Sequence, residues 1–149
     1  PFVKKLISSN PDIIFDIYGY KNNQPIWSND FYDALYKSKM ALNLSRINNV
    51  KYYSSNRIAS LVGNGILTFV DKNTKLNDFF SNDEIVFYKN IKDLYNKLKY
   101  YKENDDKRIK IAKKGKEKYF KIFNNEIVAD YICSRLFDRN VKKNIFWMK

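Results

Sequence analysis

Short apolar runs alternate with amphipathic segments along most of the chain. A run of four to six residues that is rich in β-branched, aromatic and aliphatic side chains and bounded by polar or glycine positions is typical of a strand. Four such runs occur, at residues 13–18 (IIFDIY), 40–45 (MALNLS), 66–70 (ILTFV) and 85–88 (IVFY). The pattern therefore predicts four short, buried strands.

Apolar residues recur at helical spacing in the segments before, between and after these runs. Three of the segments open with residues that favour a helix start: Asp30, Asn90 with Asp93 as a capping box, and Asp105. The spacing predicts helices over residues 2–7, 30–39, 55–63, 91–101, 105–123 and 127–136. The last helix carries Cys133, which we expect to be an inert thiol in the core.

Strands that alternate with helices predict an α/β fold, with a Rossmann-like parallel sheet, helices on both faces and a helical C-terminal segment. The length of 149 residues fits one domain. Ligands of such open sheets bind at the carboxyl ends of the strands. We expect these ends at Tyr18–Gly19, Ser45–Arg46, Val70–Asp71 and Tyr88–Lys89. The architecture therefore predicts a site of the nucleotide-binding type.

Residues 53–70 (YSSNRIASLVGNGILTFV) combine a polar loop, a helix start, a glycine-marked helix end and a strand. A helix N-terminus with Arg57 in its first turn is a place where a phosphate group can bind. The alternative is a solvated arginine. The neighbouring small residues also have a purely structural alternative, as helix caps and helix stop: Ser54, Ser55, Gly63 and Gly65.

Composition limits the chemistry further. The chain has no histidine and one cysteine, which excludes an internal disulfide and a histidine base and argues against a zinc site. No apolar run approaches the ~20 residues of a membrane span, and no signal peptide opens the chain. A single cysteine fits a reducing cytoplasm. Because the chain begins inside a predicted helix, we expect a fragment of a longer protein.

The net charge of +12 is concentrated in the last third of the chain. Residues 1–88 have 10 Lys/Arg and 8 Asp/Glu, whereas residues 89–149 have 18 and 8. The lysines of the predicted helices 92–121 alternate with an aromatic stripe, as on the solvated face of an amphipathic helix. Contact with an anionic membrane surface is an alternative, and nucleic acid is another, although no known binding motif is present.

The order of several motifs resembles a known family. These are Ile17-Tyr18-Gly19, ALYKSKMALNLS, YSSNRIASLVGNGILTF, the turn LNDFF and the strand EIVFY. Over residues 12–132 they are similar to the C-terminal domain of GT-B glycosyltransferases, especially the group related to the spore-maturation protein CgeB. The resemblance implies a domain that holds the nucleotide diphosphate of a sugar donor, without a metal or other cofactor. The acceptor site and the catalytic base would belong to a separate N-terminal domain.

The resemblance also implies roles for individual residues. It places Ser54, Ser55, Asn56 and Arg57 at a helix start next to the donor phosphates. Contacts to the donor nucleotide or sugar are implied for Tyr18, Gly19, Ser60, Gly63, Gly65, Asn77 and Asp78, of which Asp78 has an alternative as a surface turn residue.

Two positions depart from the family pattern. Many GT-B enzymes bind the ribose hydroxyls through a glutamate at the position of Ser60 and have a second glutamate at that of Tyr52. A serine can hydrogen-bond a hydroxyl group but lacks the strength of a carboxylate. The phosphate contacts are therefore better supported than the ribose contacts.

The sequence thus predicts the donor-binding half of a bacterial, metal-independent GT-B glycosyltransferase. It would move a sugar from a nucleotide diphosphate sugar to a glycan, lipid or protein acceptor, in the cytoplasm or at the inner membrane face. One alternative is a non-catalytic basic Rossmann-like module that binds nucleic acid or an anionic membrane surface. The other is a degenerate glycosyltransferase domain kept for interaction.

Overall fold

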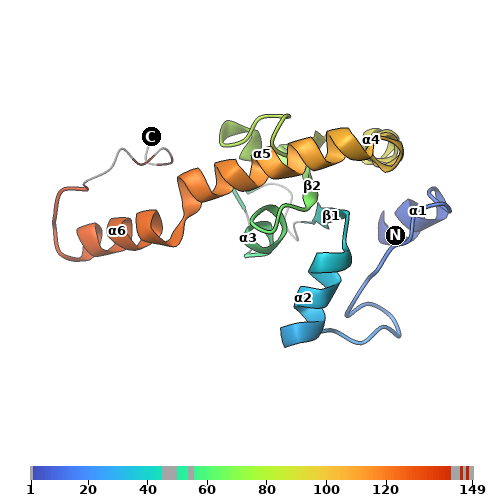
Figure 1. The fold of residues 1–149 in the computed structure, drawn as a ribbon, viewed down its shortest axis with the longest axis horizontal. Helices are drawn as coiled ribbons and strands as arrows, with labels where there is room; N and C mark the ends of the chain where they lie inside the picture. The colour runs from blue at the N-terminus through green and yellow to red at the C-terminus, as the bar shows by residue number, and fades with distance from the viewer. Residues whose placement is uncertain (1, 45–49, 54–55, 142–144, 146, 148–149) are drawn as a thin grey trace.

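The computed structural model describes residues 2–44, 50–53, 56–141, 145 and 147. Helices and strands alternate in its central part (Figure 1). The helices are α1 (Phe2–Ser8), α2 (Ser28–Lys37), α3 (Arg57–Val62), α4 (Ile91–Glu103), α5 (Asp105–Phe123) and α6 (Asn125–Leu136). The strands are β1 (Met40–Asn43), β2 (Leu67–Asp71) and β3 (Val86–Tyr88), and two single-turn 3-10 helices, η1 (Lys72–Thr74) and η2 (Leu76–Asp78), follow β2.

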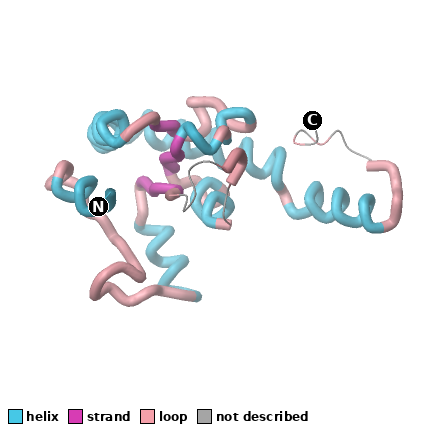
Figure 2. Tube along the Cα trace, turned by 180° about the vertical axis from the view of Figure 1, so that it is seen from behind, coloured by secondary structure: helices cyan, strands magenta, loops and turns pink. Residues whose placement is uncertain are grey.

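The three strands form one parallel sheet in the order β1-β2-β3. Leu42 pairs with Phe69 and Asn43 with Val70, while Val70 pairs with Phe87 on the other side of β2. Figure 2 shows the strands in the interior with helices around them. The predicted α/β class, parallel sheet and helical C-terminal segment are confirmed.

Alternation along the strands produces two apolar clusters, one on each face of the sheet. The first core cluster combines strand residues such as Leu67 and Phe69 with Leu6 of α1 and Leu94 of α4. The second core cluster contains Val70, Ile85, Phe87, Ile58, Val62, Leu76, Phe80 and Ile122. Helix α5 contributes to both, through Ala112 and Ile122. A sheet buried on both faces explains why its strands read as nearly continuous apolar runs.

The predicted strand at residues 13–18 is wrong, so the described sheet has three strands rather than four. Ile13 and Phe15 pack against the first core cluster, whereas Ile14 is 90% exposed. The segment therefore buries every second side chain, as a strand does, but it has no backbone partner among the described residues. The local sequence pattern cannot show whether a partner strand is present, because strand pairing joins residues that are distant in the chain.

Two of the helix starts depend on asparagine caps. The Asn90 side chain accepts a hydrogen bond from the Asp93 amide at 3.0 Å, which confirms the cap predicted for α4. Asn124 caps α6 in the same way through the Ile127 amide. Asp105 is the first residue of α5 rather than its cap. The helix predicted over 55–63 is shorter, because α3 begins at Arg57.

Helix α5 passes close to the loops that lead into β2 and β3. A Cβ atom added at Gly115 would lie 2.2 Å from the Glu84 carbonyl oxygen, so α5 and this loop touch through backbone. Gly65, with a φ of +73°, lies against the Lys116 side chain. Helix α5 thus closes the edge of the sheet formed by the amino ends of β2 and β3.

Helix α6 extends away from the body at the left of Figure 1, and α2 projects below it. Helix α2 buries none of its residues, and Tyr36 is 92% exposed. Cys133 of α6 is also exposed, so its predicted core position is wrong. The reason is that α6 extends beyond the sheet and packs mainly through Tyr131 against Trp147. Within the described residues, no helix is long and apolar enough to span a membrane.

Candidate functional site

The carboxyl ends of the strands form an edge of the sheet that α5 leaves uncovered. Strand β2 ends at Asp71, which accepts a hydrogen bond from the Asn73 amide and thereby starts η1. Strand β3 ends at Tyr88, and Lys89 and Asn90 connect it to α4. We call this region the carboxyl edge. It is the edge at which a parallel sheet of this class binds ligands.

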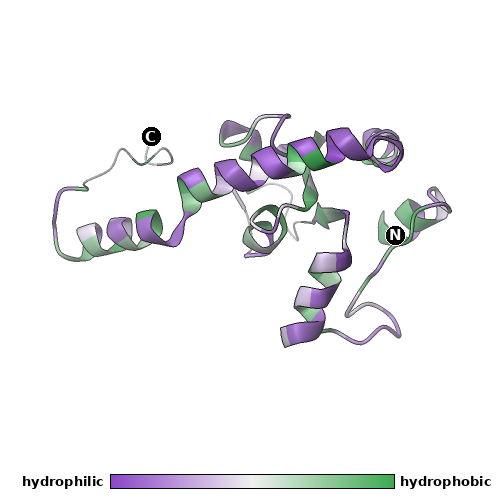
Figure 3. Ribbon diagram, in the orientation of Figure 1, coloured by the Kyte–Doolittle hydropathy of each residue, from purple (hydrophilic) through white to green (hydrophobic). Residues whose placement is uncertain are grey.

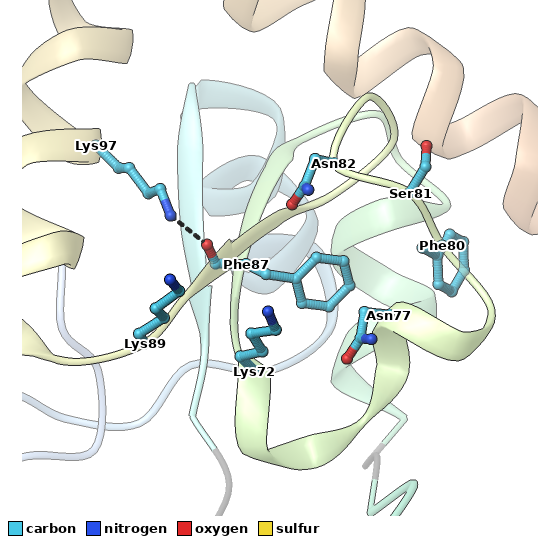
Figure 4. A pocket seen from close by; sticks show the side chains of 8 residues that line it. All are labelled: Lys72, Asn77, Phe80, Ser81, Asn82, Phe87, Lys89 and Lys97. Atoms are coloured by element: carbon cyan, nitrogen blue, oxygen red, sulfur yellow. Dashed lines mark hydrogen bonds between the residues drawn. The ribbon is translucent and has the colours of Figure 1, made fainter.

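A cavity of about 480 Å³ opens between the ends of β2 and β3 (Figure 4). Its lining consists of three lysines, two phenylalanines and three small polar residues: Lys72, Lys89, Lys97, Phe80, Phe87, Asn77, Ser81 and Asn82. No lining side chain is acidic. The cavity therefore has a positive rim over a floor of buried core residues, and we call it the lysine cavity.

Lys97 is held in place by two contacts. Its ammonium group donates to the Phe87 carbonyl at 2.5 Å and to Asp93 Oδ2 at 2.9 Å. Burial acts to raise the pKa of Asp93, but hydrogen bonds from Lys97 and from the Lys89 amide outweigh it and lower the pKa below its ordinary value. Lys97 and Asp93 thus form a compensated pair at the back of the lysine cavity.

Lys72 and Lys89 are the less compensated charges of the cavity. Within the described part of the chain, neither ammonium group forms an ion pair. Asp93 lies near enough to Lys89 for the two charges to influence each other, but its carboxylate is already bonded to Lys97. The lysine cavity therefore has a net positive charge that an anion could neutralise.

Arg57 lies at the carboxyl end of β1. It is the first residue of α3, and its guanidinium donates a hydrogen bond to the Leu44 carbonyl, one residue beyond the strand. This contact positions the charge at the carboxyl edge, as the phosphate prediction requires. Asn56 occupies the cap position without a side-chain cap bond. Ser54, Ser55 and Arg46 lie outside the described residues.

Asp78 has a structural role in the loop after β2. The Tyr52 hydroxyl donates to Asp78 Oδ2 at 2.7 Å, and the Lys51 ammonium lies 3.7 Å from the same oxygen. The Tyr52 amide also donates to the Thr74 carbonyl at 2.8 Å, and its ring packs on Phe79. These contacts tie residues 50–53 to η1 and η2 and account for Asp78 as the surface turn residue of the alternative interpretation.

Four other predicted residues lie away from the lysine cavity. Gly63 and Gly65 stand between α3 and β2, at the amino end of β2, and face α5 through Tyr119 and Lys116. Ser60 is on α3, where its carbonyl accepts from the Asn64 side chain. Gly19, with a φ of +68°, packs on Pro25. The positive φ values of Gly19 and Gly65 explain the glycines at these two positions structurally.

Tyr18 is half-exposed in the same N-terminal loop and does not line the cavity. Of the predicted site residues that the structure describes, Asn77 lines it. The lysines were missed as site residues, although Lys72 and Lys89 each stand one residue beyond a strand. That position was the available signal, because residues after parallel strands share one edge.

Asn43 is a further feature of the carboxyl edge that the sequence pattern did not indicate. It is the last residue of β1 and is 2% exposed. Its amide nitrogen has no hydrogen-bond partner within the described structure. A buried unpaired donor costs free energy, so this position is not optimised for stability alone.

The described residues contain no group of three or more histidine, cysteine, aspartate or glutamate side chains that could hold a metal ion. A comparison with protein families finds a match to the family described as glycosyl transferase-like, over residues 1–134. No curated protein and no solved structure matches the sequence. The family match spans most of the chain, including the sheet, the carboxyl edge and nearly all of α6. The chain therefore belongs to the glycosyl transferase-like family.

Proposed function

We propose that this domain binds the diphosphate of a nucleotide sugar at the carboxyl edge and is the donor-binding half of a GT-B glycosyltransferase of the CgeB-related group. The observation that carries the proposal is the position of Arg57, whose guanidinium is anchored to the Leu44 carbonyl where β1 ends. The family match supports glycosyl transfer in general. The carboxyl edge is where nucleotides bind in open parallel sheets.

The chemistry of the proposal is stabilisation of the leaving group. When the bond between sugar and diphosphate breaks, negative charge builds up on the departing phosphate oxygens. A guanidinium can donate two parallel hydrogen bonds to such oxygens and strengthen its contact as the charge develops. In this proposal Arg57 does so without a divalent cation, and a separate domain supplies the acceptor site and any general base.

The ribose contact is proposed to be weak. Ser60 provides a hydroxyl rather than a carboxylate, and the Tyr52 hydroxyl is already bonded to Asp78. A hydrogen bond to a charged group contributes about 1.5–3 kcal/mol, roughly twice the contribution of a neutral pair. We therefore expect the affinity for nucleotides to depend on the phosphates more than on the ribose.

Isothermal titration of the chain with UDP, GDP, ADP and CMP, each with and without EDTA, tests the proposal. We expect at least one nucleoside diphosphate to bind, with an affinity that EDTA leaves unchanged. Arg57→Ala should weaken that binding about tenfold or more, because it removes a charge-assisted contact. Arg139→Ala, which removes the same charge beyond α6, is the matched control. Absence of nucleotide binding, or equal binding by Arg57→Ala, would contradict the proposal.

Peripheral contact with an anionic membrane is a secondary proposal, based on the lysines along α4 and α5. Most of those in α5 are exposed, and Figure 3 shows the polar face of α5 turned outward. Each basic residue near such a surface contributes about 1 kcal/mol. Co-sedimentation with phosphatidylserine vesicles at two salt concentrations tests it, with phosphatidylcholine vesicles as control. Equal sedimentation with both lipids would exclude an electrostatic membrane contact.

A further inference from the structure

We propose that the lysine cavity is a second anion site, which binds a carboxylate or phosphate carried by a sugar or polyol. The inference rests on the proposed function for the source of that anion, which is either an acidic donor sugar or a phosphorylated acceptor. The chemistry of the cavity itself does not depend on the proposed function. The cavity itself is defined by its own charges, size and walls.

The charges of the cavity favour an anionic ligand. Figure 4 shows Lys72, Lys89 and Lys97 grouped around the end of β3, with Lys97 bonded to the Phe87 carbonyl. Lys97 is neutralised by Asp93, whereas Lys72 and Lys89 face a lining without acidic groups. Two positive charges in the lining of one concave surface raise its local potential, which attracts an oxyanion.

The remaining lining favours a polyhydroxylated ligand over a bare ion. Asn77, Ser81 and Asn82 provide amide and hydroxyl groups that can both donate and accept hydrogen bonds. Phe80 and Phe87 are 3% and 5% exposed and belong to the second core cluster, so they form the floor of the cavity and leave its polar residues accessible. The volume of about 480 Å³ lies within the roughly 300–1,000 Å³ typical of small-molecule sites. A sugar-sized ligand with one oxyanion matches the charge, the polar lining and the volume of the cavity.

The lysine cavity is separate from the position of Arg57. Arg57 is bonded to the residue after β1, whereas Lys89 follows β3, and β2 lies between these strands. Strands are spaced about 4.8 Å apart, so the two positions differ by roughly 10 Å across the sheet. Lys72 follows the intervening strand β2, but a phosphate group held by Arg57 leaves Lys89, beyond β3, for another anion. The cavity is therefore available for another part of the donor or for the acceptor.

Titration of the 149-residue chain with glucuronate, glucose 6-phosphate and glucose tests the inference. We expect both anionic sugars to bind about tenfold more tightly than glucose, since each charge-assisted hydrogen bond contributes about 1.5–3 kcal/mol, or a factor of ten or more. Lys72→Ala/Lys89→Ala should remove this difference. The matched control is Lys99→Ala/Lys102→Ala, which removes the same charge from exposed positions of α4 and should retain the difference.

Further titrations distinguish an acidic donor sugar from a phosphorylated acceptor, and they distinguish this inference from the proposed function. A preference for UDP-glucuronate over UDP-glucose that depends on the two lysines indicates an acidic donor sugar, whereas a preference for glucose 6-phosphate over glucuronate indicates a phosphorylated acceptor. Equal binding of charged and neutral sugars, or an unchanged double variant, overturns the inference. Loss of nucleoside diphosphate binding in the double variant but not in Arg57→Ala also overturns it, because the cavity would then hold the diphosphate. Lysine-dependent binding of acidic sugars without any nucleotide binding would uphold the inference and reject the proposed function.

Discussion

The two edges of the sheet differ in almost every physical respect. At the amino ends of β2 and β3, helix α5 touches the incoming loops so closely that Gly115 has no room for a Cβ atom. At the carboxyl ends, the chain leaves a cavity with two lysines that form no ion pair within the described structure. The amino edge is closely packed and stabilises the fold, whereas the lysines of the carboxyl edge add little to the stability of the fold.

The difference separates residues that stabilise the fold from residues that are available to bind a ligand. Backbone contact and buried apolar surface fix α5 at the amino edge. At the carboxyl edge, the buried Asn43 amide has no partner within the described residues, which is unfavourable, and Lys72 and Lys89 bring like charges to one cavity. Four sets of substitutions test this contrast, and they follow in order of decreasing change in stability.

Gly115→Ala should lower the free energy of unfolding by about 3 kcal/mol, the upper range for overpacking a well-packed site. The added Cβ would lie 2.2 Å from a backbone carbonyl oxygen, which cannot rotate away as a flexible side chain can. Urea denaturation measures the change, and Lys113→Ala on the exposed side of α5 is the control. A Gly115→Ala variant as stable as the parent would mean that the amino edge is not packed as described.

Tyr88→Phe should remove part of the loss of stability at alkaline pH. Burial, with the nearby Asp71 carboxylate, raises the pKa of Tyr88 to about 12. The folded state therefore keeps a proton that the unfolded chain releases near pH 10, so the contribution is complete below pH 10 and is lost as the pH rises toward 12. At pH 11 the loss is about 1.4 kcal/mol relative to pH 8.

Urea denaturation at both pH values measures this term. The Tyr88→Phe variant should lose about 1.4 kcal/mol less than the parent between pH 8 and pH 11. Tyr32→Phe, an exposed change on α2, should follow the parent at both values. A parallel pH dependence of parent and Tyr88→Phe would show that this tyrosine is not buried at the end of β3.

Asn43→Leu should raise the free energy of unfolding by about 1 kcal/mol, because it replaces an unpaired buried donor by an apolar group of similar size. Asn43→Ala is the informative companion, since it also removes the donor but leaves a void and should not stabilise. Thermal and urea denaturation distinguish the two. Destabilisation by leucine would indicate that the amide has a partner in solution, and the carboxyl edge would then resemble the amino edge.

Lys72→Ala/Lys89→Ala should change the free energy of unfolding by no more than about 0.5 kcal/mol, as expected for exposed residues without specific partners. Lys97→Ala provides the contrast, because it breaks the bonds to Asp93 and to the Phe87 carbonyl. It should cost about 1 kcal/mol. A double variant that is clearly less stable than the parent would assign the two lysines to the fold rather than to a ligand.

Much of the fold could be predicted from local pattern. The strand predictions at 40–45, 66–70 and 85–88 each match an observed strand, because a strand buried on both faces needs a continuous apolar run. The Asn90 cap was readable because its hydrogen bond joins residues three apart. The segment 13–18 has the same apolar character but no partner strand among the described residues, and pairing is a property of distant residues.

The candidate site was less predictable than the fold. The position of Arg57 at the carboxyl edge agrees with the sequence-based interpretation, and the direct test of its role is ligand binding. The lysine cavity was not predicted, since its walls come from η1, η2, the loop after it, β3 and α4. No local pattern brings Lys72 and Lys97 together.

The α/β class, three of the strands, the helical C-terminal segment and the excess of positive charge follow from residue type and short-range spacing. Three features follow from the three-dimensional arrangement instead: Gly63 and Gly65 face α5 at the amino edge, the Asn43 amide is buried without a partner in the described structure, and Lys72 and Lys89 line one cavity. Those outcomes depend on which strand ends and helices meet in space. Burial and charge proximity are set by that meeting and not by neighbours along the chain.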